Sequence, residues 1–439
     1  MDVSVATAVG LSIAERTRRR IVARLIPFLF ILYIINYLDR VNISYAKLQM
    51  APALGFSEAV FGFGAGIFFF GYFLLEIPGT LIVERWSARK WIARIMISWG
   101  IVATLMGFIQ NATQFYWLRL ILGAAEAGFF PGIIVYLSHW FRYEDRGKAV
   151  ALFMSALPVS NLIGSPMSGL LLGVNWWGLA GWRWLFIIEG IPAVILGFIT
   201  LCYLTDWPHE AKWLPKDEQQ WLSAELEREK EARKAARPLS ILQAFKQPAV
   251  WLMVIIYFLA LCGFYSFTFW LPTLIKQWSG MSDLKVTLFA MIPYTVGLVS
   301  MLTMGWSSDR SGERRWHSAC SLIAAGIGFV LVAMTGHQLA MVIATFCLVS
   351  AGGHAFFPSF WAMPTAFLTE AAAAATIGLI NSFGNLGGTV GGYVIGYLKT
   401  TTGSFESGVL CSAGAMIAAG LLIFVIRPRH VSVSSSTSD

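Results

Sequence analysis

Charged residues are scarce in this chain of 439 residues, and that scarcity excludes most soluble folds. Asp, Glu, Lys and Arg make up 13% of the chain, whereas soluble globular proteins carry roughly 25%. Hydrophobic residues account for 57%, more than one water-soluble core could bury. The apolar runs are each about 20 residues long, the length of a membrane-spanning helix. We therefore expect an all-α integral membrane protein.

The chain also lacks the residue patterns of several other classes of protein. Its five cysteines are scattered singly through apolar segments, with no CxxC or Cys/His cluster that would indicate zinc or a disulfide framework. No nucleophile–base set or phosphate-binding loop is present, which argues against a membrane enzyme. The formal charge of +8 comes from basic residues in short loops, without a basic stripe, so we expect no nucleic-acid partner. No metal or other cofactor is expected.

The apolar runs predict about twelve membrane spans. Their approximate limits are 25–45, 59–83, 91–110, 114–138, 148–173, 183–204, 249–275, 285–306, 317–336, 339–367, 376–398 and 407–426. One long polar segment, 205–247, has alternating charges that suit a solvated amphipathic helix. It separates six spans from six. We expect residues 1–204 and 248–439 to form two six-helix halves, joined by 205–247.

Lys and Arg gather in alternate loops, which predicts the orientation of the chain. The basic loops follow spans two, four and eight, and the tail is also basic: Arg85, Arg89, Lys90; Arg142, Arg146, Lys148; Arg310, Arg314, Arg315; Arg427, Arg429. Cytoplasmic loops carry such an excess. We therefore expect a multi-pass protein of the cell inner membrane, with both termini in the cytoplasm and an uncleaved N-terminal segment.

Three short matches recur at one offset of about 225 residues. They pair Ala127–Gly132 with His354–Ser359, Glu84–Arg85 with Asp309–Arg310, and Asn161–Leu162 with Asn385–Leu386. An offset repeated in this way indicates two structurally similar halves. Pseudo-symmetric halves are the build of many secondary transporters.

Asp39 and Arg40 lie side by side inside the first predicted span. Each ionisable group in the hydrocarbon costs roughly 2.5–3.5 kcal/mol on insertion scales, so the pair indicates a functional site within the membrane. A pair at a helix end that reaches the headgroups is the alternative. Glu126 is a second intramembrane acid, and Arg119, seven residues earlier, projects from the same helix face about 10 Å away. Glu126 and Arg119 could instead form a structural pair.

The loop Gly305–Arg315 reads G-x3-D-R-x-G-x-R-R and resembles a loop of the major facilitator superfamily. The segments Asn36–Ser44, Gly181–Phe186 and Phe360–Pro364 make the chain similar to the anion:cation symporter branch, from about residue 20 to 427. That branch includes sugar-acid, tartrate and aromatic-acid carriers. The resemblance implies the twelve-helix facilitator fold and transport of organic anions, usually with protons.

The resemblance also implies roles for individual residues. Asp39 and Glu126 would bind the coupling protons, Arg40 the substrate carboxylate, and Arg119 would be the electrostatic partner of an acid. Four further residues would contact substrate: Tyr72, Trp361, Asn381 and Ser359. Four would act in gating, as conformational latches after spans two and eight: Glu84, Arg85, Asp309 and Arg310.

Together these features predict a symporter that imports an organic carboxylate with protons by alternating access. The fifth predicted span, 148–173, has no glutamine. Some members of the branch use a glutamine there to contact sugar hydroxyls, so its absence argues against a hexonate substrate. An anion exchanger, a sodium-coupled carrier and, less readily, a transporter-like receptor are alternatives. The expected partners are a small organic anion and the lipid bilayer, and we expect a monomer.

Overall fold

A computed structural model describes residues 12–235, 246, 248–335, 338–364 and 370–426. Within its helices, the side chains of residues 80, 81, 84, 85, 232–235 and 370–375 are not described. Over the described ranges the chain is helical and contains no strand. The expectation of an all-α protein is therefore confirmed.

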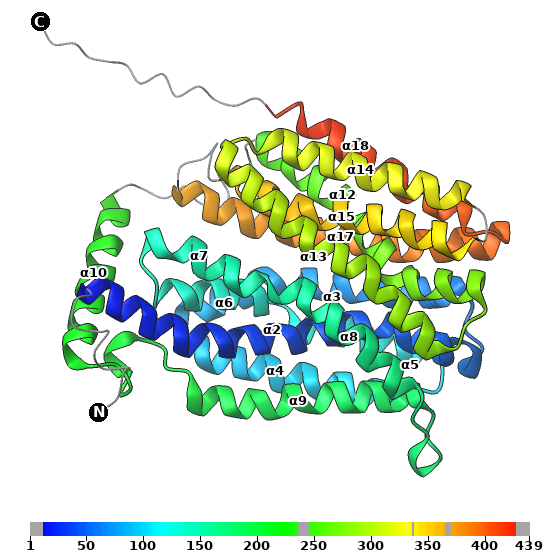
Figure 1. Ribbon diagram of the computed structural model, residues 1–439. Coiled ribbons are helices and arrows are strands. Elements are labelled where there is room, and N and C mark those ends of the chain that lie inside the picture. Colours follow the sequence, from blue (N-terminus) through cyan, green and yellow to red (C-terminus); the bar gives the residue numbers. More distant parts are fainter. Residues whose placement is uncertain (1–11, 236–245, 247, 336–337, 365–369, 427–439) are drawn as a thin grey trace, which may run out of the picture.

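The first part of the chain forms a bundle of helices drawn from blue to green in Figure 1. These helices are α2 (Ile13–Leu54), α3 (Glu58–Arg85), α4 (Ala88–Met106), α5 (Ala112–Glu126), α6 (Phe129–Ser138), α7 (Tyr143–Met154), α8 (Ala156–Leu172) and α9 (Gly181–Tyr203). Two short 3-10 turns, η1 (Trp176–Gly178) and η2 (Pro208–Glu210), flank α9. Helix α10 (Lys216–Ala235) follows and lies within the segment that we expect to link the halves.

A second bundle, drawn from green to red, lies beside the first along its length (Figure 1). Its helices are α12 (Pro248–Ser279), α13 (Asp283–Ser311), α14 (Arg315–Met334), α15 (Leu339–Trp361), α17 (Glu370–Thr402) and α18 (Glu406–Ile423). Helix α3 packs against α17, and α8 packs against α13, so the two bundles meet along both pairs.

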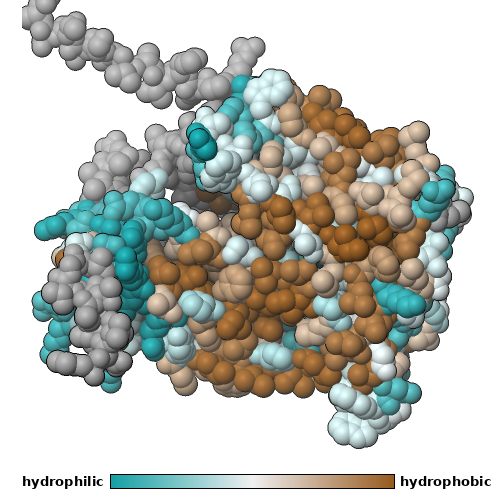
Figure 2. Space-filling model, viewed as in Figure 1, coloured by the Kyte–Doolittle hydropathy of each residue, from teal (hydrophilic) through white to brown (hydrophobic). Residues whose placement is uncertain are grey.

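Ten stretches of the described chain are long and apolar enough to cross a membrane. The predicted spans 91–110 and 376–398 fall on α4 and α17, which are not among those ten. Helix α4 begins with Arg89 and Lys90 and also carries Arg94, while α17 is rich in glycine and alanine. Both still pack among the apolar helices, α4 against α9 and α17 against α12. On the face that Figure 2 shows, hydrophobic residues cover the middle of the molecule and hydrophilic residues lie over α10.

The fourth predicted span is broken, which the sequence pattern did not indicate. Helix α5 ends at Glu126 and α6 begins at Phe129, with Gly128 between them at φ 83°. Only glycine adopts this left-handed conformation without steric cost, and Pro131 falls in the first turn of α6, where a missing N–H leaves no bond unmade. The matching segment of the second half has Ala355 in place of Gly128, and it continues as one helix. The break is therefore confined to the first half.

The two halves are joined at the end of the molecule opposite α10. The side chain of Gln49 donates to Asp283 at 3.0 Å, and Lys47 donates to Thr273 at 3.0 Å. Along α3 and α17 the backbones approach closely, since a Cβ on Gly62 would lie 2.6 Å from the carbonyl oxygen of Gly392. Small residues allow such approach between membrane helices. At the other end, beside α10, Figure 2 shows a recess between the two halves.

Gly387 tests how far this close packing determines stability. Its Cβ would meet the carbonyl oxygen of Phe258 at 2.1 Å, so Gly387→Ala must push α17 away from α12. We expect a cost of about 1–3 kcal/mol, typical of overpacking, and a lower midpoint of thermal unfolding in detergent. Gly378→Ala is the matched control on the same helix, because nothing lies within 4 Å of that position. The control should be unchanged or more stable, and equal destabilisation of both variants would contradict the packing account.

Candidate functional site

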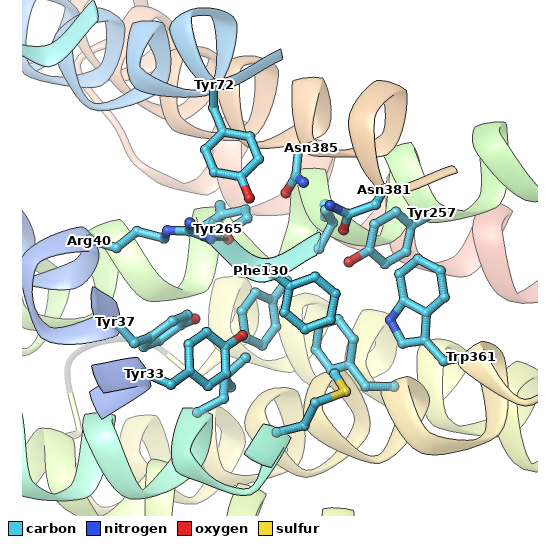
Figure 3. A pocket seen from close by; sticks show the side chains of 15 residues that line it. Tyr33, Tyr37, Arg40, Tyr72, Phe130, Tyr257, Tyr265, Trp361, Asn381 and Asn385 are labelled. Atoms are coloured by element: carbon cyan, nitrogen blue, oxygen red, sulfur yellow. Dashed lines mark hydrogen bonds between the residues drawn. The ribbon is translucent and has the colours of Figure 1, made fainter. Parts of the chain in front are cut away.

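A pocket lies between the two halves, near the middle of the helices (Figure 3). The space between its walls, including the part open to solvent, is about 550 Å³. The first half contributes Tyr33, Tyr37, Arg40, Tyr72, Phe130, Met154 and Leu157. The second half contributes Tyr257, Leu261, Phe264, Tyr265, Phe357, Trp361, Asn381 and Asn385. The walls are thus mostly aromatic, and Arg40 is the one charged side chain among the described residues that line them.

Arg40 reaches the pocket from α2 and is held by groups of both halves. Its Nη2 forms an ion pair with Oε1 of Glu126, and its Nη1 donates to the Tyr265 hydroxyl at 3.5 Å. The guanidinium lies over the rings of Tyr72, at 5.2 Å, and Phe68, at 5.4 Å. Its Nε has no hydrogen-bond partner. A cation with an unused donor at a pocket wall is suited to bind an anion.

Glu126 neutralises Arg40 in this conformation. It is the last residue of α5, next to the break at Gly128, and its side chain is fully buried. Its Oε2 accepts no hydrogen bond. Removing one partner of a buried ion pair costs about 3–5 kcal/mol, because the other charge is left uncompensated. An anion that reaches Arg40 must therefore replace Glu126, or Glu126 must be protonated.

Asp39 does not line the pocket, although it precedes Arg40 in the chain. Successive residues of a helix point about 100° apart, so Asp39 faces the interior of the first half. It accepts a hydrogen bond from Nε1 of Trp99 at 2.7 Å and one from Asn42 at 3.4 Å. In the described part of the chain, no basic nitrogen lies within 4.0 Å of its carboxylate. The two acids predicted to bind protons therefore lie in separate environments.

Arg119 is fully buried, but it does not form an ion pair with Glu126. It donates to the backbone carbonyls of Gly64 at 3.3 Å and Ala65 at 3.1 Å. Glu126 acts on it only through space. The direct partner of Glu126 is Arg40. Arg119, which was predicted to be the electrostatic partner of an acid, makes its hydrogen bonds to backbone carbonyls in this conformation.

The predicted substrate contacts divide into two groups. Tyr72, Trp361 and Asn381 line the pocket together with Arg40 (Figure 3). Trp361 packs edge-on against Tyr257, with ring centroids 4.9 Å apart. Ser359 is buried in α15 outside the pocket lining, and its hydroxyl has no hydrogen-bond partner. Asn381 also donates to Glu76 of α3, which ties α17 to the first half.

The predicted gating residues lie in the last turns of α3 and α13. Asp309 pairs with Arg314 of its own loop at 2.6 Å and is largely exposed. The guanidinium of Arg310 lies 5.4 Å from the ring centroid of Trp306. The side chains of Glu84 and Arg85 lie outside the described residues. In this conformation Asp309 thus pairs with a residue of the same α13–α14 connection.

Sequence reasoning missed several residues of the pocket: Tyr33, Tyr37, Tyr257, Tyr265 and Asn385. A signal for two of them was present, because Tyr33, Tyr37 and Arg40 are spaced four and three residues apart, the spacing of one helix face. The match of Asn385 with Asn161 in the internal repeat was a second signal. Over the described residues, no group of three or more His, Cys, Asp and Glu side chains could hold a metal ion.

The chain closely resembles several bacterial transporters. It is 46% identical over 428 residues to a putative tartrate transporter of Agrobacterium vitis, which covers 97% of this chain and 94% of that protein. It is 39% identical to the putative metabolite transport protein NicT of Pseudomonas putida, covering 98% and 100%. A quinolone resistance transporter of Acinetobacter baumannii is 38% identical, covering 94% and 95%.

Solved structures share the fold at low sequence identity. The xylose transporter XylE of E. coli, in a partially occluded inward-open conformation, matches with TM-score 0.73 and 12% identity, over 93% of this chain and 98% of that one. A bacterial homologue of the lysosomal transporter Spinster matches with TM-score 0.72 and 15% identity, over 91% and 94%. The sequence profile of the Major Facilitator Superfamily matches residues 29–391 and, in an overlapping match, 279–439. With this fold and these relatives, the chain belongs to the Major Facilitator Superfamily of membrane transporters.

Proposed function

We propose that this secondary transporter carries an organic carboxylate together with protons, by alternating access to the pocket between its halves. The family and the transporters it resembles make it a non-enzymatic, multi-pass membrane carrier of a small molecule. The observation that carries the finer proposal is the buried ion pair between Arg40 and Glu126 at the pocket wall. The name of the tartrate transporter, whose substrate would be a carboxylate, supports the same class.

The ion pair suggests how an anion and a proton would be coupled. When Glu126 binds a proton, Arg40 loses its counter-ion and becomes available to a carboxylate. When the carboxylate leaves, Arg40 again favours ionised Glu126, which releases its proton. Because an uncompensated charge at this site costs about 3–5 kcal/mol, the empty deprotonated and the loaded protonated states are favoured over mixed ones. This exchange of counter-ions couples substrate to proton.

Coupling to protons would also supply the free energy that import of an anion requires. An anion that enters an inside-negative cell works against about 2.3 kcal/mol per charge per 100 mV. One proton cancels the charge of a monoanion, and further protons would use the membrane potential. Asp39 lies close enough to act electrostatically with Glu126, and we propose it as the second proton site. Tyr72, Trp361 and Asn381 would hold the remainder of the substrate.

The contacts between the halves suggest which end of the pocket is open. The hydrogen bonds of Lys47 and Gln49 to the second half lie at the end opposite α10. We propose that this end faces outward and is closed here, while the α10 end faces the cytoplasm and is open. The loop between α8 and α9, with Trp177 at 89% exposure, would then be extracellular.

The first test concerns Glu126. Glu126→Gln imitates the protonated acid, so Arg40 stays available to anions but no proton is released. We expect gradient-driven uptake of L-tartrate or another transported carboxylate to be lost, while counterflow in liposomes continues. Glu210→Gln, on the exposed η2 turn and outside the pocket lining, is the control for a carboxylate away from the site. Normal concentrative uptake by the Glu126→Gln protein would remove this acid from coupling.

The second test concerns the geometry of Arg40. Arg40→Lys keeps the charge but loses the planar fork that grips a carboxylate at two points. A charge-assisted hydrogen bond contributes about 1.5–3 kcal/mol, so we expect carboxylate affinity to fall roughly tenfold to a hundredfold. Arg94→Lys, on α4 and outside the pocket lining, should bind normally. Unchanged affinity of the purified Arg40→Lys protein would refute the assignment.

The third test concerns orientation. In a background without native cysteines, Glu227→Cys on α10 and Trp177→Cys in the α8–α9 loop place exposed thiols at opposite ends. A membrane-impermeant maleimide added to intact cells should label the protein with Trp177→Cys only, because positive loops remain in the cytoplasm. Labelling of the Glu227→Cys protein under these conditions would reverse the topology.

A further inference from the structure

Glu189 is a buried acid that the pocket does not use. It lies on α9, is 2% exposed and is not among the residues that line the pocket. Helix α9 packs against α4, α2 and α8, so Glu189 is enclosed within the first half. Among the described residues no Lys, Arg or His nitrogen lies within 4.0 Å of its carboxylate. A buried charge without a cation is costly enough that such a group usually becomes neutral.

The hydrogen bonds of Glu189 are too few for an ionised carboxylate. Its Oε1 accepts from Ser168 at a long 3.5 Å, and its Oε2 has no partner. The side chain of Asn42 lies beside Glu189, and the Asn42 carbonyl oxygen Oδ1 also has no hydrogen-bond partner. A proton on Glu189 would supply the missing donor to Asn42. Protonation would thus satisfy two buried oxygens at once.

Asp39, on the other side of Asn42, accepts hydrogen bonds on both of its carboxylate oxygens. Asn42 donates to Oδ1 of Asp39 at 3.4 Å, and Trp99 donates to Oδ2 at 2.7 Å. Hydrogen bonds from N–H donors favour the ionised form of a carboxyl group. Asn42 therefore bridges one acid that is supplied with donors and one that lacks them. Two acids so connected share their negative charge, because ionising one opposes ionising the other.

We propose that Glu189 is a further proton site of the carrier, which holds a proton in this conformation and is linked to Asp39 through Asn42. The proton would leave the Glu189 carboxyl group when the first half rearranges, so that one more proton travels per cycle. This part of the proposal rests on the proposed proton coupling. The other titratable groups that act on the pair are Tyr45 of α2 and Glu126 of α5. Helices α4 and α8 face it with Trp99 and Ser168, which do not titrate.

Infrared spectroscopy of the ligand-free protein tests where the proton lies. A protonated carboxyl group has a carbonyl stretch that a carboxylate lacks. At neutral pH we expect such a band in the wild-type protein, its loss in Glu189→Gln, and its persistence in Asp39→Asn. An identical band in the Glu189→Gln protein would overturn the proposal. This measurement needs no substrate, so it stands whether or not the proposed transport function holds.

Transport measurements test whether this proton moves. In liposomes, L-tartrate uptake against set pH and voltage gradients gives the number of protons carried per tartrate. Glu189→Gln should still transport but carry one proton fewer than the wild-type protein. An unchanged ratio would overturn the coupling role of Glu189. If wild-type protein transports tartrate without protons, the proposed function fails instead, and the infrared result remains separate.

A second variant keeps the proposal testable if Glu189→Gln does not fold. Ser168→Ala removes the hydroxyl that donates to Glu189 and so disfavours its ionised form. The carboxylic-acid band should then persist to higher pH than in wild-type protein. Ser160→Ala is the matched control, because Ser160 lies on the same helix and donates to the carbonyl of Ala156. A band that disappears at the same pH in the Ser168→Ala protein would count against Glu189.

Discussion

The ion pair between Arg40 and Glu126 is the interaction on which the rest of the site depends. It joins α2 to the end of α5 within the first half, and the Tyr265 hydroxyl joins it to the second. Because both charges are buried, neither can be lost without a replacement. In the proposed mechanism, a substrate carboxylate would replace Glu126 beside Arg40, and a proton on Glu126 would replace the charge of Arg40. The aromatic walls reinforce this requirement, since the lining residues that the structure describes offer no other charge to stabilise Arg40.

The position of Glu126 follows from a local break that only one half contains. Gly128 ends α5 in a left-handed conformation, so the acid stands at a helix end instead of in the middle of a continuous span. Discontinuous helices of this kind commonly form substrate and ion sites in transporters. The second half repeats the surrounding residues but has Ala355 at the corresponding place. The halves can therefore share an architecture while only the first carries the pair.

Much of the architecture could be predicted from the sequence, because apolar runs of membrane length leave the backbone few alternatives to a helix. The direction of individual side chains was harder to predict. Ser359 and Trp361 are two residues apart on one helix, yet only Trp361 lines the pocket. Apart from Tyr72, which the family resemblance indicated, the tyrosines of the pocket carry no charge and so did not draw attention in an apolar sequence. The break at Gly128 was also missed, since one glycine among 41 has no distinctive pattern.

Asp39 and Arg40 are adjacent on α2, but their side chains lie in different surroundings. Arg40 faces the pocket, whereas Asp39 faces Trp99, Asn42 and the interior of the first half. A substrate bound at Arg40 would therefore not touch the Asp39 acid, and a proton on that acid would not occupy substrate space. Communication between the two must pass through the backbone of α2 and through the field of Glu126, which acts on both. A small rotation of α2 would then alter the surroundings of both charges together.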